Sequence, residues 1–149
     1  MEKILHKKHK GFTLVELLVV VAIIGLLSMM VVISVKNIKA KARDAERVSE
    51  MNSIATVLNL YHNDYNFYPI FDGYITGIDD FSVALKATSY INNVPTDPLE
   101  MDSSSCGGVL NLTGYHYYYQ GDGGDYILGY CLETNSMQGV ARGENYLSP

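Results

Sequence analysis

Few residues of this chain have the type and spacing that chemistry requires. Glu16 is a carboxylate inside an apolar run that extends over residues 12–35, and Cys106 and Cys131 are the only cysteines. The four histidines form no His-x-x-x-His pair, and the sequence has no cysteine–histidine zinc spacing, nucleophile elbow or phosphate-binding loop. We therefore expect no enzyme activity, and the carboxylates and cysteines carry most of the functional information.

The apolar run is long enough to cross a membrane once. Its 24 residues, 12–35, span about 36 Å as a helix, against a hydrocarbon thickness of about 30 Å. The run is longer than the roughly 7–15-residue apolar region of an ordinary secretory signal, so we do not expect its removal. Basic residues flank it on both sides and do not settle the orientation. The very short N-terminal segment and the two cysteines of the acidic remainder favour a cytoplasmic N-terminus.

A carboxylate within this run needs a physical explanation. Placing one near the middle of a membrane costs roughly 2.5–3.5 kcal/mol on insertion scales. One explanation is that Glu16 lies near the headgroups and favours the positive N-terminal end of the helix dipole. The other is a positive partner in the same apolar layer, where a low dielectric strengthens the attraction and penalises an unpaired charge.

The stretch KGFTLVELLVVVAIIGLL, residues 10–27, resembles the N-terminal signature of type IV pilins and of type II secretion pseudopilins. In that family a prepilin peptidase removes a short basic leader that ends in glycine, and the new N-terminal phenylalanine is N-methylated. The resemblance therefore implies cleavage between Gly11 and Phe12 and methylation of Phe12. It also implies that Glu16 sets the register of assembly by pairing with the free amine of a neighbouring subunit.

The helix pattern continues beyond the apolar run, since neither Gly nor Pro occurs from Leu26 until Pro69. We expect one helix from Phe12 to about Asn63, and its first half must contact lipid or other copies. The belt of charges from Lys36 to Glu50 is interpreted as a solvated face. The absence of a proline near Ile33, where many pilins have one, leaves the continuity of the helix in a filament open. Residues at three- and four-residue steps are expected to face inward: Ile38, Ala42, Ala45, Val48, Met51, Ala55, Leu58, His62 and Tyr65.

The composition changes after the helix and predicts a small α+β domain. Residues 61–77 are rich in Tyr, Asn, Asp and Gly and are expected to form a loop. A short helix follows, with Asp79 or Asp80 as its N-cap and Phe81, Ala84, Leu85 and Tyr90 expected to face inward.

Next, the segment GYHYYYQGDGGDYILGYCLE, residues 114–133, predicts a hairpin that turns at its Gly-Asp-Gly-Gly. Gly129 is expected to let the sheet approach the long helix closely. The C-terminal residues are expected to add an edge strand around Val140 or to remain a tail. The fold class is therefore α+β, with a long, partly transmembrane N-terminal helix packed on a small C-terminal antiparallel sheet.

The resemblance extends to this region, because VPTDPL, residues 94–99, followed by a tyrosine-rich hairpin is similar to the C-terminal part of the same family. It implies a pilin-like organisation in four parts. These are a cleaved basic leader (1–11), a transmembrane or filament-core helix (12–35), an exported half of the helix (36–65) and a globular domain (66–149).

The two cysteines and the acidic loops are candidate sites in the exported part. An even cysteine count in such a domain favours a disulfide between Cys106 and Cys131. The resemblance suggests calcium in the C-terminal loops, and Asp122 with Asp125 supplies hard oxygen ligands. Asp97, Glu100 and Asp102 are a second candidate set. Neither cluster has EF-hand spacing, and solvated turn aspartates are the alternative interpretation.

The sequence therefore predicts a structural subunit of a type IV pilus or a type II secretion pseudopilus, cut after Gly11 and polymerised through its N-terminal helix. The resemblance implies as partners copies of the chain itself, prepilin peptidase, an inner-membrane assembly platform, minor pilins or pseudopilins, and membrane lipid. The acidic composition argues against nucleic acid. The subunit is expected to cross the cytoplasmic membrane once, N-terminus inside, before joining a cell-surface or periplasmic filament. The alternative is a membrane-anchored binding module that keeps its leader and does not polymerise.

Overall fold

The structure is a computed structural model that describes residues 11–99, 106, 110, 112, 114–135 and 141–149, without the side chains of residues 30–33. Contacts between residues divide the chain into two compact units, Met1–Ile38 and Lys39–Pro149. One long helix, α1, contributes to both units, and each unit is described by itself.

Helix α1 (Leu14–Tyr65) is one continuous helix of 52 residues. No proline interrupts its backbone hydrogen bonds. At its C-terminal end Asn66 adopts a positive φ of 59°, and its N–H donates to the carbonyl of His62 at 2.8 Å. This left-handed residue ends the helix. The prediction of one helix from Phe12 to about Asn63 is confirmed, with both ends two residues further along the chain.

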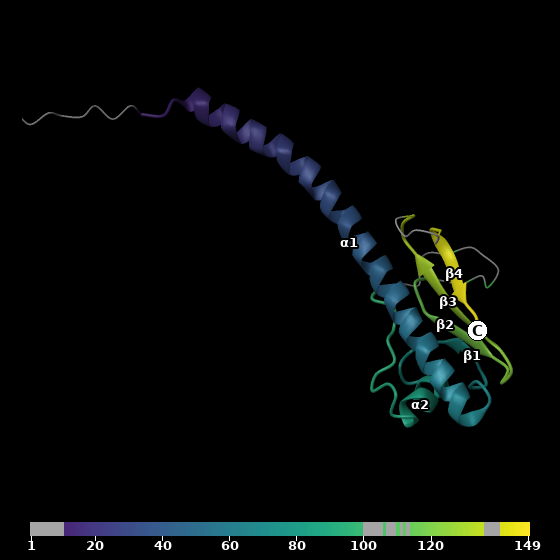
Figure 1. Ribbon diagram of the computed structural model, residues 1–149. Coiled ribbons are helices and arrows are strands. Elements are labelled where there is room, and N and C mark those ends of the chain that lie inside the picture. The colour runs from purple at the N-terminus through teal and green to yellow at the C-terminus, as the bar shows by residue number, and fades with distance from the viewer. Residues whose placement is uncertain (1–10, 100–105, 107–109, 111, 113, 136–140) are drawn as a thin grey trace, which may run out of the picture. The chain divides into compact units, whose positions relative to one another are not determined.

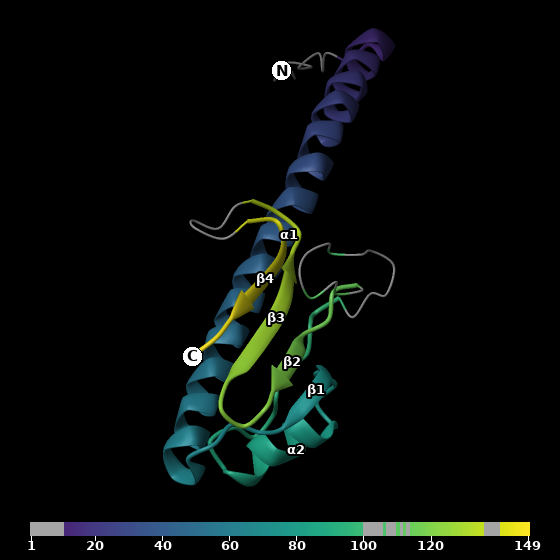
Figure 2. The same ribbon diagram turned by 90° about the vertical axis from the view of Figure 1, so that its right-hand side faces the viewer.

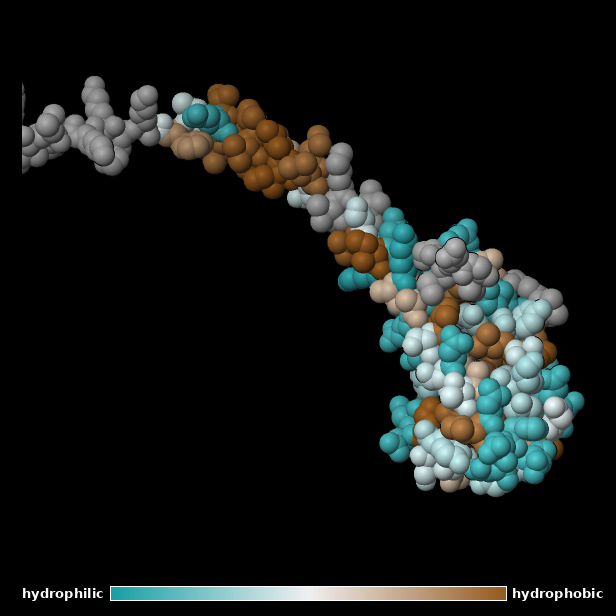
Figure 3. Space-filling view, in the orientation of Figure 1, coloured by the Kyte–Doolittle hydropathy of each residue, from teal (hydrophilic) through white to brown (hydrophobic). Residues whose placement is uncertain are grey.

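The first half of α1 is apolar and exposed. An 18-residue window of the helix has a mean hydropathy of 3.0, and none of that window is buried within the described structure. Figure 3 shows these apolar side chains as a continuous brown surface. By length and composition, this helix is able to cross a membrane, as the sequence predicts.

The second unit contains a four-stranded antiparallel sheet in the order β1-β2-β3-β4. The strands are β1 (Phe71–Tyr74), β2 (Tyr118–Gly121), β3 (Tyr126–Leu132) and β4 (Gly143–Leu147). The predicted hairpin is confirmed as β2 and β3, with Tyr119 opposite Leu128. The C-terminal edge strand exists but begins three residues after Val140. The loop prediction was wrong at β1, which is held as a strand by its pairing with β2.

The core of the second unit lies between α1 and one face of the sheet (Figures 1 and 2). Helix α1 contributes aliphatic side chains, and the sheet contributes mainly tyrosines. The buried residues include Met51, Ile54, Val57, Leu58, Tyr117, Tyr119, Tyr126, Leu128, Tyr130 and Leu132. The ring of Tyr119 stacks on Phe81 with their centroids 4.0 Å apart. The predicted α+β layout is therefore confirmed, with the tyrosines packing the sheet against the helix.

Helix α2 (Asp80–Ala87) closes this core from the side of β1 (Figure 1). Of the two predicted N-cap candidates, Asp79 is the N-cap, and its carboxylate accepts a hydrogen bond from the N–H of Ser82 at 2.8 Å. Phe81 and Leu85 are buried as expected. Tyr90 is not inward, because it is 45 % exposed and its hydroxyl donates to Asp64.

Gly129 permits a close approach, but not to α1. Side chains alternate along a strand, and Leu128 and Tyr130 face the helix, so Gly129 faces the other side of the sheet. A Cβ atom there would lie 2.9 Å from Cδ1 of Leu110 and 3.1 Å from Cδ1 of Leu112. The prediction of a close contact with the helix was therefore wrong in its partner: the side chains of Leu110 and Leu112 cover Gly129.

Candidate functional site

The predicted processing and assembly residues lie at the start of α1. Gly11 and Phe12 precede the helix and are exposed, with Phe12 78 % exposed. Thr13 and Glu16 form a capping box. The Thr13 hydroxyl and N–H donate to Oε2 of Glu16 at 3.0 and 3.2 Å, and the Glu16 N–H donates to the Thr13 hydroxyl at 3.2 Å. The Glu16 carboxylate therefore has hydrogen-bond partners within its own chain.

This capping box was missed by the sequence analysis, although the pattern T-x-x-E at residues 13–16 is its known signature. It fits the interpretation that Glu16 favours the N-terminal end of the helix dipole in a single copy. Cleavage after Gly11, methylation of Phe12 and pairing of Glu16 with a neighbouring amine all remain predictions.

A second constellation, a buried ion-pair cluster, lies where α1 meets the sheet domain. It consists of Arg43, Asp44, Arg47, Asp97 and Glu133. The Arg47 guanidinium binds Asp97 through two hydrogen bonds of 2.6 and 3.0 Å, and it also reaches Asp44 at 3.0 Å and Glu133 at 2.8 Å. Arg47, Asp44 and Asp97 have fully buried side chains. The cluster thus joins α1 to two segments that lie 50 and more residues away in sequence.

Neighbouring backbone and side-chain groups hydrogen-bond the buried charged groups of the cluster. Asp44 accepts from the N–H groups of Glu133 and Thr134, each at 2.8 Å, and from the Thr134 hydroxyl at 2.7 Å. Arg43 adds two hydrogen bonds to Glu133. The Arg47 guanidinium also lies 4.7 Å from the ring centre of Tyr115. A buried charge is tolerated only when it is paired and hydrogen-bonded in this way.

The cluster corrects the prediction of a solvated charged face from Lys36 to Glu50. Asp44 and Arg47 occupy the inward positions of α1, whereas Ala42 and Ala45, which were predicted to face inward, are exposed. Charged residues were assigned to solvent because their partners, Asp97 and Glu133, are supplied by distant parts of the chain. An arginine and an aspartate three residues apart on one helix face gave a local signal, but that spacing is also common on solvated surfaces.

The hydrogen bonds and burial in the cluster shift the pKa values of its charged groups. Burial disfavours the charged form of Arg47, but the hydrogen bonds that it donates to Asp97 and Glu133 outweigh this effect and keep the pKa of Arg47 above its ordinary value. Burial likewise disfavours ionised Glu133, yet hydrogen bonds from Arg43 and Arg47 hold the pKa of Glu133 below its ordinary value. The two arginines and Glu133 therefore stay charged at neutral pH.

The lowered pKa of Glu133 predicts a loss of stability in acid. A carboxyl with a lower pKa in the folded than in the unfolded chain stabilises the fold above its unfolded pKa, about 4.3 for Glu. That contribution is lost as the pH falls through the folded value. We expect the free energy of unfolding to fall below about pH 4.3, and Glu133→Gln to make this dependence shallower. Urea unfolding of the full chain in detergent between pH 3 and pH 7 measures both.

Two features define the comparison for this acid test. Burial raises the pKa of Glu50, so this residue contributes a pH dependence of opposite sign, and it is left unchanged in both proteins. Asp80→Asn, which alters an exposed carboxylate of α2 outside the cluster, is the control and should retain the wild-type slope. Equal slopes for wild type and Glu133→Gln would contradict the assignment of acid sensitivity to the ion-pair cluster.

The cysteine prediction is confirmed by a disulfide between Cys106 and Cys131. The same segment is held a second time by Glu144 of β4, which the sequence analysis missed. Its carboxylate accepts from the N–H of Leu110 at 2.7 Å and of Leu112 at 3.2 Å. Disulfide and carboxylate thus hold Cys106, Leu110 and Leu112 to strands β3 and β4.

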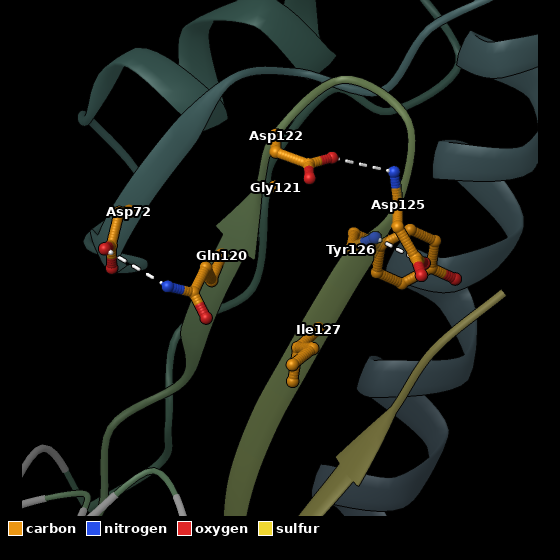
Figure 4. A pocket seen from close by; sticks show the side chains of 7 residues that line it. All are labelled: Asp72, Gln120, Gly121, Asp122, Asp125, Tyr126 and Ile127. Atoms are coloured by element: carbon orange, nitrogen blue, oxygen red, sulfur yellow. Dashed lines mark hydrogen bonds between the residues drawn. The ribbon is translucent and has the colours of Figure 1, made fainter.

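The predicted calcium ligands lie on the turn between β2 and β3 (Figure 4). Asp122 and Asp125 line an open pocket of about 400 Å³ together with Asp72. Oδ1 of Asp122 accepts from the N–H groups of Gly124 and Asp125, and these hydrogen bonds lower the pKa of Asp122. Figure 4 shows both aspartates turned toward the turn backbone.

Calcium takes six to eight oxygen ligands, and in the described part of the chain no group of three or more His, Cys, Asp or Glu is placed to hold a metal ion. In the second predicted set, Asp97 is bound to Arg47, while Glu100 and Asp102 lie outside the described residues. The described residues alone do not form a calcium site, and calcium binding stays a prediction.

Comparisons with known proteins agree with the N-terminal geometry. Residues 6–33 match the family described as the prokaryotic N-terminal methylation motif, and this match includes Gly11, Phe12 and Glu16. No solved structure matches the chain significantly.

Curated relatives extend the similarity beyond this motif, and all are type II secretion system core protein G. The chain is 30 % identical over 97 residues to that of Escherichia coli K12, covering 61 % of this chain and 67 % of the relative. Identity is 30 % over 98 residues to the protein of Aeromonas hydrophila, with 62 % and 68 % covered. It is 33 % over 98 residues to that of Klebsiella michiganensis, with 62 % and 69 % covered. The chain therefore belongs to the type II secretion system core protein G family of pseudopilins.

Proposed function

We propose that this chain is a core structural subunit of a type II secretion pseudopilus. In this proposal prepilin peptidase cuts between Gly11 and Phe12, the new N-terminus is methylated, and the mature subunits polymerise through the first half of α1. The observation that carries the proposal is the methylation motif over residues 6–33 in a chain related to core protein G over more than half its length.

The geometry of the first unit supports this function. Phe12 and the apolar residues that follow it are exposed and need lipid or other subunits as neighbours. Glu16 is hydrogen-bonded to Thr13, which lowers the cost of holding a carboxylate in an apolar layer before assembly. After cleavage the free amine of Phe12 supplies a positive charge at the same level for a neighbouring subunit. The membrane-anchored binding module explains neither the motif nor these relatives.

Processing is tested by expressing the full chain with and without a prepilin peptidase and measuring the mass of its N-terminal peptide. We expect a mature chain that starts at methylated Phe12 only when the peptidase is present. Gly11→Leu should leave the leader in place. An intact leader on the wild-type chain beside an active peptidase would overturn the proposal and favour the anchored module.

The role of Glu16 is tested in the same cells. Glu16→Leu and Glu16→Gln should be cut normally, but the amount of sedimentable filament should fall about tenfold or more, because the charge pair between subunits is lost. Thr13→Val, which removes the capping hydroxyl but keeps the carboxylate, is the matched control and should assemble more than either Glu16 variant. Wild-type levels of filament from Glu16→Leu would exclude the pairing role.

A further inference from the structure

The second unit carries opposite charges at its two ends. Along α1, Lys39 and Lys41 are exposed near the beginning of this unit. Arg142 is exposed too, and its N–H bonds Asn135 close to the ion-pair cluster. We call Lys39, Lys41 and Arg142 the basic end. Beside the two lysines, Ala42 and Ala45 are exposed, since Asp44 and Arg47 take the inward positions.

The opposite end of the unit is acidic and apolar. The last turn of α1, helix α2 and the β2–β3 turn gather there (Figures 1 and 2). Its exposed carboxylates are Asp64, Asp72, Asp80, Asp122 and Asp125. Its one lysine in the described chain, Lys86, donates to the carbonyl of Gly77 at 2.5 Å. We call this surface the acidic end.

Apolar side chains stand among these carboxylates. Ile70 is 77 % exposed, Tyr65 49 % and Phe67 43 %. Ile70 lies at the β2–β3 turn, because a Cβ atom on Gly123 would be 3.7 Å from Cγ1 of Ile70. An exposed apolar patch rimmed by charges of one sign is the composition of a docking surface for a partner of opposite charge.

The chain itself carries the complementary surface, but one copy cannot bring the two together. From Lys39 to Tyr65, α1 rises about 39 Å at 1.5 Å per residue, and it is helical throughout. Complementary surfaces at opposite ends of one molecule make a heterologous contact, which repeats from copy to copy and builds an open filament.

We propose that the acidic end of one copy docks on the basic end of a second copy of this chain. Asp64, Asp122 and Asp125 face Lys39, Lys41 and Arg142 of the neighbour, and Phe67 and Ile70 cover its Ala42 and Ala45. The inference rests on the proposed function, since it names the surfaces through which the sheet domains of a pseudopilus meet.

Charge exchange tests this contact in the full, peptidase-processed chain. Lys39→Glu with Lys41→Glu, and separately Asp64→Lys with Asp125→Lys, should each lower the amount of sedimentable filament about tenfold. The variant with all four substitutions should recover to within about threefold of wild type, because the charges again match. Asn52→Lys, which places a new charge on an exposed residue of α1 midway between the two ends, should leave the amount unchanged.

A disulfide cross-link tests the proposed contact between copies independently of the amount of filament. Cells that co-express Ala42→Cys and Ile70→Cys chains should give a disulfide-linked dimer between the two, whereas cells with either variant alone should not. Within one chain these positions are too far apart to bond, since residues 42 and 65 are about 35 Å apart along α1.

The outcomes separate this inference from the proposed function. If the wild type forms filaments and both charge-reversed variants form as much, the docking contact is overturned while the subunit role stands. The same holds if the variant with all four substitutions does not recover. Failure of the wild-type chain to be processed or to form any filament would overturn the proposed function itself. The dependence on salt is a further test, because filaments held by this contact should dissociate more readily at 1 M than at 0.1 M ionic strength.

Discussion

Arg47→Met is expected to lower the free energy of unfolding by about 3–5 kcal/mol, the cost of leaving a buried charge without its partner. The substitution keeps the volume of the side chain near that of the original but leaves Asp44 and Asp97 buried without the guanidinium. Both carboxylates are fully buried, so water cannot replace it. Urea unfolding of the full chain in detergent, followed by circular dichroism, measures the change from the transition midpoint.

Two further variants identify the cause of this loss. Arg43→Met removes an arginine of the same cluster that is 27 % exposed, and it should cost only about 1 kcal/mol. Adding Asp44→Asn and Asp97→Asn to Arg47→Met should restore part of the stability, because the uncompensated charges disappear. A loss below about 1 kcal/mol in Arg47→Met would contradict the structural assignment of the cluster.

Replacing both cysteines by serine is expected to lower the free energy of unfolding by about 3.5 kcal/mol in the chain-entropy account of a loop of this length. The disulfide closes a segment with a sequence separation of 25 residues. One of its two cysteines, Cys131 of β3, is fully buried. Unfolding of the double variant, compared with wild type under non-reducing conditions, measures the effect.

Glu144→Gln separates the contribution of the disulfide to stability from that of the hydrogen bonds that Glu144 accepts. It removes the charge of the carboxylate that accepts from Leu110 and Leu112 and should cost about 1–2 kcal/mol on its own. In the cysteine-free chain the same substitution should cost more, because Glu144 is then the remaining anchor. An unchanged stability after loss of both cysteines would show that Glu144 suffices to hold the segment.

Those features of the fold that depend on neighbours in sequence were predictable. The α1 helix follows from its apolar start and from a run of residues without Gly or Pro from Leu26 onward, and the hairpin follows from its Gly-Asp-Gly-Gly turn. The Asp79 cap was predicted for the same reason. Each is specified by hydrogen bonds or backbone preferences within a few residues.

The features that were missed depend on distant partners. Asp44 and Arg47 became inward residues only because Asp97 and Glu133 meet them. Strand β1 contains Asp72 and Gly73, residues that disfavour strands, and forms by pairing with β2. The capping box of Thr13 and Glu16 is the exception, because a local pattern contained it. For the candidate site, the disulfide was predicted and is present, the processing residues stay a prediction, and the ion-pair cluster was not predicted.

The position of the ion-pair cluster has a mechanical consequence. Arg43, Asp44 and Arg47 of α1 all hydrogen-bond distant parts of the sheet domain, so a pull along the helix reaches that domain at residues 43–47. Apolar contacts slide with little resistance, whereas short, directional hydrogen bonds between charged groups resist shear. Arg47 joins the helix to Asp97 and Glu133 through such bonds. A pull on α1 would therefore pass to the folded domain through the hydrogen bonds of Arg43, Asp44 and Arg47.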